Sequence, residues 1–98
     1  MSPIEVRIND KVRISGDDRI YPGGEVSRRL FGRETILVER LEGKMSKGKD
    51  SYRVSQVDSQ YPHDPPVQKL LIGKDQPSGS FYVTDVHGNS YKVEVKYV

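Results

Sequence analysis

The sequence contains no cysteine and no tryptophan. Without cysteine, the chain can form neither a disulfide nor a zinc site built on thiolates. With only two phenylalanines, some of the six tyrosines must help to fill the core. The chain also lacks an apolar run long enough to cross a membrane, and its N-terminus has no signal-peptide pattern. We therefore expect a protein that is made in the cytoplasm and does not enter a membrane.

The sequence also lacks a large excess of positive or of negative charge. Sixteen Lys and Arg residues stand against 14 Asp and Glu, which leaves a net charge of +2. A protein dedicated to nucleic acid usually shows a strong basic excess. At 98 residues, the length predicts one small domain, residues 1–98.

No catalytic pattern is visible. The two histidines, His63 and His87, lie in different predicted loops, and the usual hydrolase, zinc-protease and phosphate-loop motifs are absent. The Asp17-Asp18 pair lies beside a glycine, where such carboxylates usually form turns. One imidazole and one carboxylate at His63-Asp64 are too few ligands for a metal. We expect no enzymatic activity, no metal and no cofactor.

What the sequence does contain is alternation. Its first apolar stretch, residues 4–14, carries Ile4, Val6, Ile8, Val12 and Ile14 at even positions and mostly polar residues between them. Because side chains alternate faces along a strand, the even positions are predicted to be buried. Asn9-Asp10 interrupts the pattern as a bend, a bulge or the end of a short first strand. A polar, glycine-containing loop follows over residues 15–24.

Further strands are predicted over residues 35–41, 52–57 and 67–72, the first two forming a hairpin around a flexible loop at 42–51. Residues 25–32 are predicted as one helical turn or an irregular crossover, ended by Gly32. Residues 58–66, which contain three prolines in five residues, are predicted to form a stiff connector inside the domain, and we call this segment the proline connector.

The C-terminus is predicted to form a hairpin from residues 81–86 and 91–98. With Gly88-Asn89 as a two-residue turn, Val86 faces Tyr91 and Asp85 faces Lys92. In this register Tyr82 and Thr84 share a face with Val93 and Val95. Short strands, frequent turns and no long helical pattern together predict an all-β fold, a small barrel or a sandwich of antiparallel strands with a C-terminal hairpin.

Basic and aromatic residues suggest where a ligand would bind. If the folded chain brings them to one side, they would form an aromatic patch rimmed by positive charge, which suits a protein partner or a phosphate backbone. The alternative is that the charges only solvate the surface. The predicted partner-binding residues are Tyr21, Arg28, Arg29, Phe31, Arg33, Lys44, Lys47 and Tyr52.

Three segments of residues 6–57 carry a resemblance to a known family. The stretch from Val6 to Gly16, the Tyr21-Pro22-Gly23-Gly24 loop and the strand at 35–41 resemble the SH3-like modules in cell-wall hydrolases of Gram-positive bacteria and their phages. Residues 58–98 have no counterpart in those modules. The resemblance implies an SH3-like β-barrel that binds peptidoglycan or another protein.

We therefore expect a non-enzymatic binding module with a protein or peptidoglycan partner. The resemblance further implies a phage or prophage accessory or structural protein, acting in the virion or at the host cell wall. The alternative is a small nucleic-acid-binding barrel that uses the arginine and lysine clusters.

Overall fold

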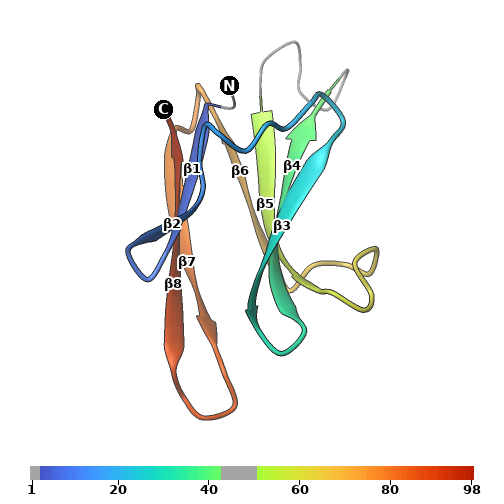
Figure 1. Ribbon diagram of the computed structural model, residues 1–98, viewed down its shortest axis with the longest axis vertical. Coiled ribbons are helices and arrows are strands. Elements are labelled where there is room, and N and C mark those ends of the chain that lie inside the picture. The colour runs from blue at the N-terminus through green and yellow to red at the C-terminus, as the bar shows by residue number, and fades with distance from the viewer. Residues whose placement is uncertain (1–2, 43–50) are drawn as a thin grey trace.

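The structure, a computed structural model, describes residues 3–42 and 51–98. They form two four-stranded antiparallel sheets that pack face to face (Figure 1). One sheet has the order β2-β1-β8-β7, and the other has the order β3-β4-β5-β6. The strands are β1 (Ile4–Ile8), β2 (Lys11–Ile14), β3 (Glu25–Phe31), β4 (Glu34–Leu41), β5 (Ser51–Asp58), β6 (Gln68–Gly73), β7 (Ser78–Thr84) and β8 (Ser90–Tyr97).

Within each sheet, almost every strand pairs with its neighbour in sequence, and the exception is the pairing of β8 with β1. The chain changes sheet between β2 and β3 and again between β6 and β7. Among the described strands no backbone ladder joins the two sheets at these corners, so the barrel is not closed. The expected all-β class and the sandwich alternative are confirmed. The two ends of the described chain meet, because Val98 N donates to Pro3 O over 2.8 Å.

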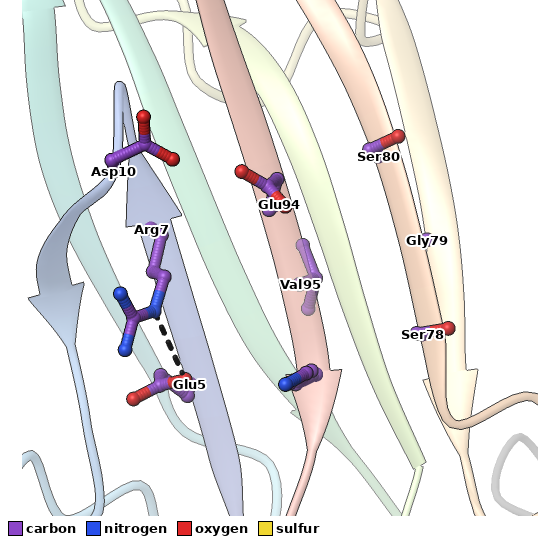
Figure 2. Close-up of a pocket in the computed structure, with 9 residues that line it drawn as sticks. Glu5, Arg7, Asp10, Ser78, Gly79, Ser80, Glu94 and Val95 are labelled. Atoms are coloured by element: carbon purple, nitrogen blue, oxygen red, sulfur yellow. Dashed lines mark hydrogen bonds and ion pairs between the residues drawn. The ribbon is translucent and has the colours of Figure 1, made fainter.

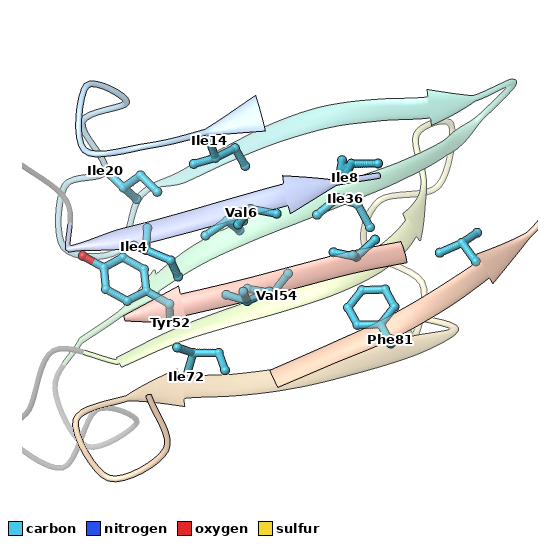
Figure 3. Packing of buried hydrophobic residues seen from close by; sticks show 14 residues of the cluster. Ile4, Val6, Ile8, Ile14, Ile20, Ile36, Tyr52, Val54, Ile72 and Phe81 are labelled. Atoms are coloured by element: carbon cyan, nitrogen blue, oxygen red, sulfur yellow. The ribbon is translucent and has the colours of Figure 1, made fainter. Parts of the chain in front are cut away.

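The core lies between the inner faces of the two sheets (Figure 3). It is built mostly from isoleucine and valine, whose branched side chains suit a pleated surface. Tyr52 is the largest fully buried side chain, so one tyrosine helps to fill the core as expected. The buried cluster comprises Ile4, Val6, Ile8, Ile14, Ile20, Ile36, Val38, Tyr52, Val54, Ile72, Phe81, Val83, Val93 and Val95.

Asn9 and Asp10 end the first strand and form the turn between β1 and β2. Their φ angles are 50° and 68°, and a two-residue hairpin turn of this hand requires positive φ at both positions. The turn is also fixed to β8, because Asn9 N donates to Lys92 O over 3.0 Å and Asn9 Oδ1 accepts from Lys92 N over 2.9 Å.

A register shift in the same hairpin changes which side chains of β2 face the core. Arg7 pairs with Val12, but Val6 pairs with Ile14, so the register skips Arg13. This bulge returns Ile14 to the core and leaves Val12 exposed on the outer face. The even-position prediction is therefore confirmed at four of the five apolar positions and wrong at Val12.

The helical turn predicted for residues 25–32 is wrong, because this segment is strand β3. Val26 and Leu30 pack against the core as half-buried side chains. β3 is an edge strand beside the open corner, and one of its inward positions carries a charged residue, Arg28. The alternation of apolar and polar residues that marks a strand is therefore hidden in the sequence. Gly32 ends the segment as predicted, with a φ of 50° in the turn before β4.

The middle of the chain largely follows the prediction. The strands expected at 35–41 and 52–57 pair as β4 and β5, and the strand expected at 67–72 is β6. The proline connector joins β5 to β6 of the same sheet. Most of the flexible loop expected at 42–51 lies outside the described residues.

The predicted register of the C-terminal hairpin is wrong. The observed pairs are Thr84 with Ser90 and Phe81 with Val93, so the loop spans five residues, 85–89, rather than two. This register differs from the predicted one by three residues, and an odd shift reverses the faces of β7. Phe81 is consequently buried, whereas Tyr82 is exposed.

Asp85 organises the five-residue loop instead of facing Lys92. Its Oδ1 accepts from His87 N and Asn89 N, each over 2.9 Å, and its Oδ2 accepts from Asn89 Nδ2 over 3.1 Å. Desolvation raises the pKa of Asp85, but the hydrogen bonds from Asn89 and His87 outweigh it and hold the pKa below its ordinary value. The ionised carboxylate is therefore the form that stabilises the loop.

This arrangement predicts an acid-sensitive hairpin. Because the folded-state pKa is lowered, the contribution of Asp85 is complete above its unfolded-state pKa of roughly 3.9 and is lost as pH falls through the folded-state value. We expect Asp85→Ala to melt at a lower temperature than the wild type at pH 7, and the gap to narrow towards pH 2. Asp17→Ala, at an exposed loop carboxylate, serves as the control and should show no such narrowing. A gap for Asp85→Ala that is the same at every pH would contradict this role.

The β1–β2 turn predicts a stabilising substitution. Residues other than glycine pay a cost at positive φ, so Asp10→Gly should raise the free energy of unfolding by about 0.5 kcal/mol. Asp10→Ala removes the carboxylate but keeps the Cβ atom, and it should give no gain. Denaturant unfolding of the three proteins measures the difference, and an equal effect of both substitutions would refute the backbone explanation.

Candidate functional site

The predicted aromatic patch is not assembled. Tyr21 precedes β3 and Phe31 ends it, and a strand of seven residues spans roughly 20 Å. Tyr21 is 69% exposed, whereas Phe31 packs on Tyr91 with 5.0 Å between ring centroids. Tyr52 lies in the core and offers nothing to a surface.

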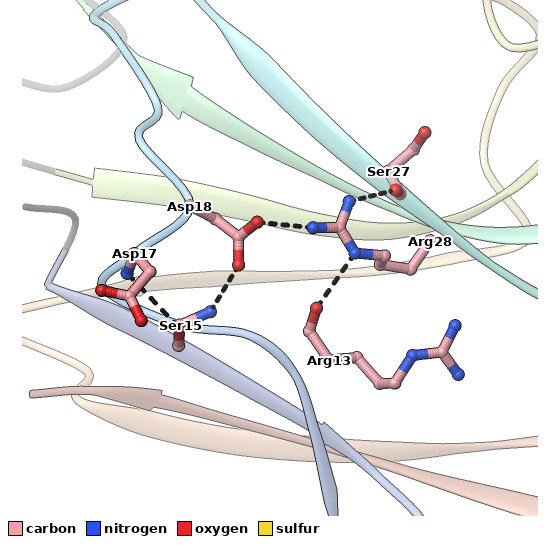
Figure 4. A network of polar contacts seen from close by, with 6 residues as sticks. All are labelled: Arg13, Ser15, Asp17, Asp18, Ser27 and Arg28. Atoms are coloured by element: carbon pink, nitrogen blue, oxygen red, sulfur yellow. Dashed lines mark hydrogen bonds and ion pairs between the residues drawn. The ribbon is translucent and has the colours of Figure 1, made fainter.

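Three hydrogen bonds hold the half-buried side chain of Arg28 in place (Figure 4). Its Nε donates to Arg13 O over 3.0 Å, its Nη1 to Ser27 O over 2.8 Å and its Nη2 to Asp18 Oδ1 over 2.5 Å. One side chain thus ties β3 to the end of β2 and to the loop between them. We conclude that Arg28 closes a corner of the sandwich that the backbone leaves open.

Asp18 has a matching structural role. Its Oδ2 accepts from Ser15 N over 3.0 Å, and its own N donates to Ser15 O over 3.0 Å. This is the turn-forming role predicted for the Asp17-Asp18 pair.

Two of the other predicted cations, Arg29 and Arg33, do not join Arg28. Arg33 lies in the β3–β4 turn, where it contacts Gln60, an Asp58 carboxylate oxygen at 3.4 Å and the Tyr61 ring at 6.0 Å from its centroid. Arg29 is exposed and alternates with Arg28 along β3, so it takes the outer face. Lys44 and Lys47 lie outside the described residues.

The outer face of the β3-β4-β5-β6 sheet instead presents a groove that the sequence did not reveal. Register places Leu37 of β4 beside Ser55 of β5, and Ser55 beside Lys69 of β6. Ser55 and Val57 point outward from the core, yet they are only 2% and 5% exposed. Their burial follows from the proline connector, which runs over this face.

We call this site the connector groove. It encloses about 390 Å³ between the sheet and the connector, and its floor and wall combine aliphatic side chains with prolines. Seven of its twelve lining residues are polar or charged, so the groove combines apolar contacts with polar groups, as ligand sites do. Its lining comprises Glu25, Leu37, Glu39, Arg53, Ser55, Val57, Pro62, His63, Asp64, Pro65, Pro66 and Lys69.

One charged pair in the connector groove is internally satisfied. Arg53 donates from Nε and Nη2 to the two carboxylate oxygens of Glu39 over 3.0 and 3.1 Å. The hydrogen bond with Glu39 raises the pKa of Arg53 above its ordinary value. The side chains of Glu25, Asp64 and Lys69 have no hydrogen bond or ion pair within the described chain, so they remain available to a ligand.

Two exposed aliphatic residues extend the apolar surface along β6. Leu71 pairs with Arg53 on the outer face, and Val67, whose N donates to Gln56 O over 3.0 Å, precedes the strand on the same side. Both are exposed, and Lys69 lies between them. The sequence feature that could have indicated this site is a set of apolar residues that alternate with the core positions of their strands, next to a run of prolines.

Comparison of the chain with protein-family models, with curated proteins and with solved structures finds no match. Within residues 3–42 and 51–98, no group of three or more His, Asp or Glu side chains is placed to hold a metal ion. The same residues include no helix that is long and apolar enough to cross a membrane.

The different surroundings of the two neighbouring arginines give a test. Arg28→Ala should lower the free energy of unfolding by about 1–3 kcal/mol, because it leaves charged and carbonyl acceptors without their donor. Arg29→Ala should change it by less than about 0.5 kcal/mol, because that side chain is exposed. Denaturant unfolding of both variants measures the difference, and equal losses would exclude the corner role of Arg28.

Proposed function

We propose that this protein is a non-enzymatic binding module whose connector groove takes up a short segment of a partner protein. The observation that carries the proposal is the concave surface between the sheet and the proline connector, which combines apolar side chains with charged ones. The connector forms its wall, and prolines lose little conformational freedom when a ligand binds. Strands supply the floor, so the site is held by rigid elements.

The lining of the groove favours a particular kind of segment. Leu37 and Val57 in the lining, and the exposed Leu71 beside the groove on β6, provide contacts for aliphatic or aromatic side chains. Glu25 and Asp64 are free carboxylates within the site, and the internal Arg53–Glu39 pair cancels its own charge. A segment with apolar side chains next to a lysine or arginine matches this distribution.

The resemblance of residues 6–57 to SH3-like cell-wall modules supports the same class of protein. It is consistent with a phage or prophage accessory or structural protein whose partner belongs to a virion or a cell wall. The nucleic-acid alternative has less support, because Arg28 and Arg33 are engaged in internal contacts and do not line a common surface.

A random dodecapeptide display library panned on the full chain tests the proposal. We expect enriched peptides that combine apolar and basic residues. Val67→Ser with Leu71→Ser should weaken their binding about tenfold or more, as expected when apolar anchors are removed. Val12→Ser, at an exposed valine on the other sheet, is the matched control and should bind normally.

Three outcomes would count against a protein ligand. The first is a library that yields no enriched peptide, and the second is equal weakening by the control and by the paired substitutions. The third is retention on double-stranded DNA that falls steeply with salt, which would favour the nucleic-acid alternative.

A further inference from the structure

The outer face of the β2-β1-β8-β7 sheet carries a second groove of a different chemistry (Figure 2). It encloses about 500 Å³, and polar side chains surround it. Val95, the one aliphatic residue in the lining, points its side chain into the core and contributes only backbone. We call this site the polar groove, and it is lined by Glu5, Arg7, Asp10, Ser78, Gly79, Ser80, Glu94, Val95 and Lys96.

Strand register arranges the charges of the polar groove in a checkerboard. In one row, Ser78 lies beside Lys96, and Lys96 lies beside Glu5. In the next row, Ser80 lies beside Glu94, and Glu94 lies beside Arg7. Each row therefore crosses β7, β8 and β1 as hydroxyl, charge and opposite charge, and the order of the charges is reversed between the rows.

Small residues line the β7 side of the groove. The side chains of Ser78 and Ser80 point outward, while Gly79 between them faces β6. A Cβ atom at Gly79 would lie 3.2 Å from a Leu70 methyl group, so glycine lets β7 approach that strand. Within the described chain, the two serine hydroxyls and the Lys96 ammonium have no side-chain hydrogen bond.

The polar groups are also free to exchange partners. Arg7 Nε contacts Glu5 Oε2 at 3.3 Å, and Lys92 Nζ contacts Glu94 Oε1 at 3.9 Å. Exposed pairs of this kind contribute little to stability. Ligand groups can therefore replace them at small cost.

We propose that the polar groove binds a neutral polysaccharide chain. Carboxylates only accept hydrogen bonds, and ammonium and guanidinium groups only donate them. Neighbouring sugar hydroxyls do both, so a row of hydroxyls matches a surface on which donors and acceptors alternate. The serine hydroxyls, which also do both, extend this match onto β7.

An exposed aromatic ring continues the surface. Tyr82 is two residues beyond Ser80 on the outer face of β7, opposite Lys92 of β8, and is 59% exposed. The apolar face of a sugar ring stacks on such a side chain while the phenol stays in water. The polar groove and Tyr82 together supply the two kinds of contact that a sugar chain needs.

Other occupants fit this groove less well. Its side chains include three carboxylates, on Glu5, Asp10 and Glu94, against two cations, so a phosphate backbone gains no attraction. Its outward side chains include no aliphatic anchor for a peptide. The inference goes beyond the protein contact proposed for the connector groove and depends on different residues.

Titration of the isotopically labelled full chain with three neutral hexasaccharides, cellohexaose, chitohexaose and maltohexaose, tests the inference. We expect at least one of them to shift the backbone amide signals of Ser78, Ser80 and Glu94. Tyr82→Ala should weaken that binding about tenfold or more. Tyr21→Ala is the matched control, since this tyrosine is similarly exposed but lies outside the groove, and it should bind as the wild type does.

A second variant keeps the inference falsifiable if Tyr82→Ala fails to fold. Ser80→Val fills the groove and removes a hydroxyl at a position where a β-branched residue suits the strand, and it should also weaken binding about tenfold or more. The inference is overturned if no hexasaccharide shifts these signals, if Ser80→Val binds normally, or if Tyr21→Ala and Tyr82→Ala have equal effects. Any of these results leaves peptide binding at the connector groove unaffected, because the residues do not overlap.

Discussion

The contact between the inner faces of the two sheets determines which side chains remain for the outer surfaces. Successive residues of a strand point to opposite faces, so one residue of register exchanges the buried set for the exposed set. The bulge at Arg13 shows how strictly this applies, because without it Ile14 would face solvent. The same constraint assigns Ser78 and Ser80 to one outer face and Leu37 and Ser55 to the other. The residues that line both candidate grooves are therefore determined by which residues of each strand face the core.

Where the backbone does not join the two sheets, side chains join them. Arg28 bridges β3 to the β2 end and its following loop at one corner. At the other corner, Gln68 Nε2 donates to Tyr82 O over 2.8 Å, linking β6 to β7. Arg13 Nη2 adds a further link at the first corner, where it donates to Arg29 O over 3.4 Å. Because removal of one partner leaves the other without its hydrogen bond, substitutions of these side chains are expected to destabilise the corners.

The sequence predicted the strands with a clear apolar pattern. β1 and β5 follow from alternation and β4 from its continuous apolar centre, although the packing of the connector also buries Val57 on the outer side of β5. β3 was missed because an edge strand is only half buried and carries Arg28 on its inner side. The β7–β8 register was missed because it depends on the Asp85 carboxylate, which closes a five-residue loop in place of the expected Gly88-Asn89 turn. Among the predicted site residues, Arg28 and Arg29 do not share a surface, because residues adjacent in a strand point to opposite faces.

The meeting of the two ends at Pro3 and Val98 has a topological consequence. β8 pairs with β1 in the interior of its sheet, so the last strand lies next to the first. Going around the sandwich, the strands therefore follow one another in sequence order, and the chain could begin at any of them. A covalent link between the ends and a break at another surface loop would preserve every strand pairing, which is the condition for a circular permutant. For the same reason, a host protein can carry these residues as an insertion in one of its own loops, with both junctions at a single place on its surface.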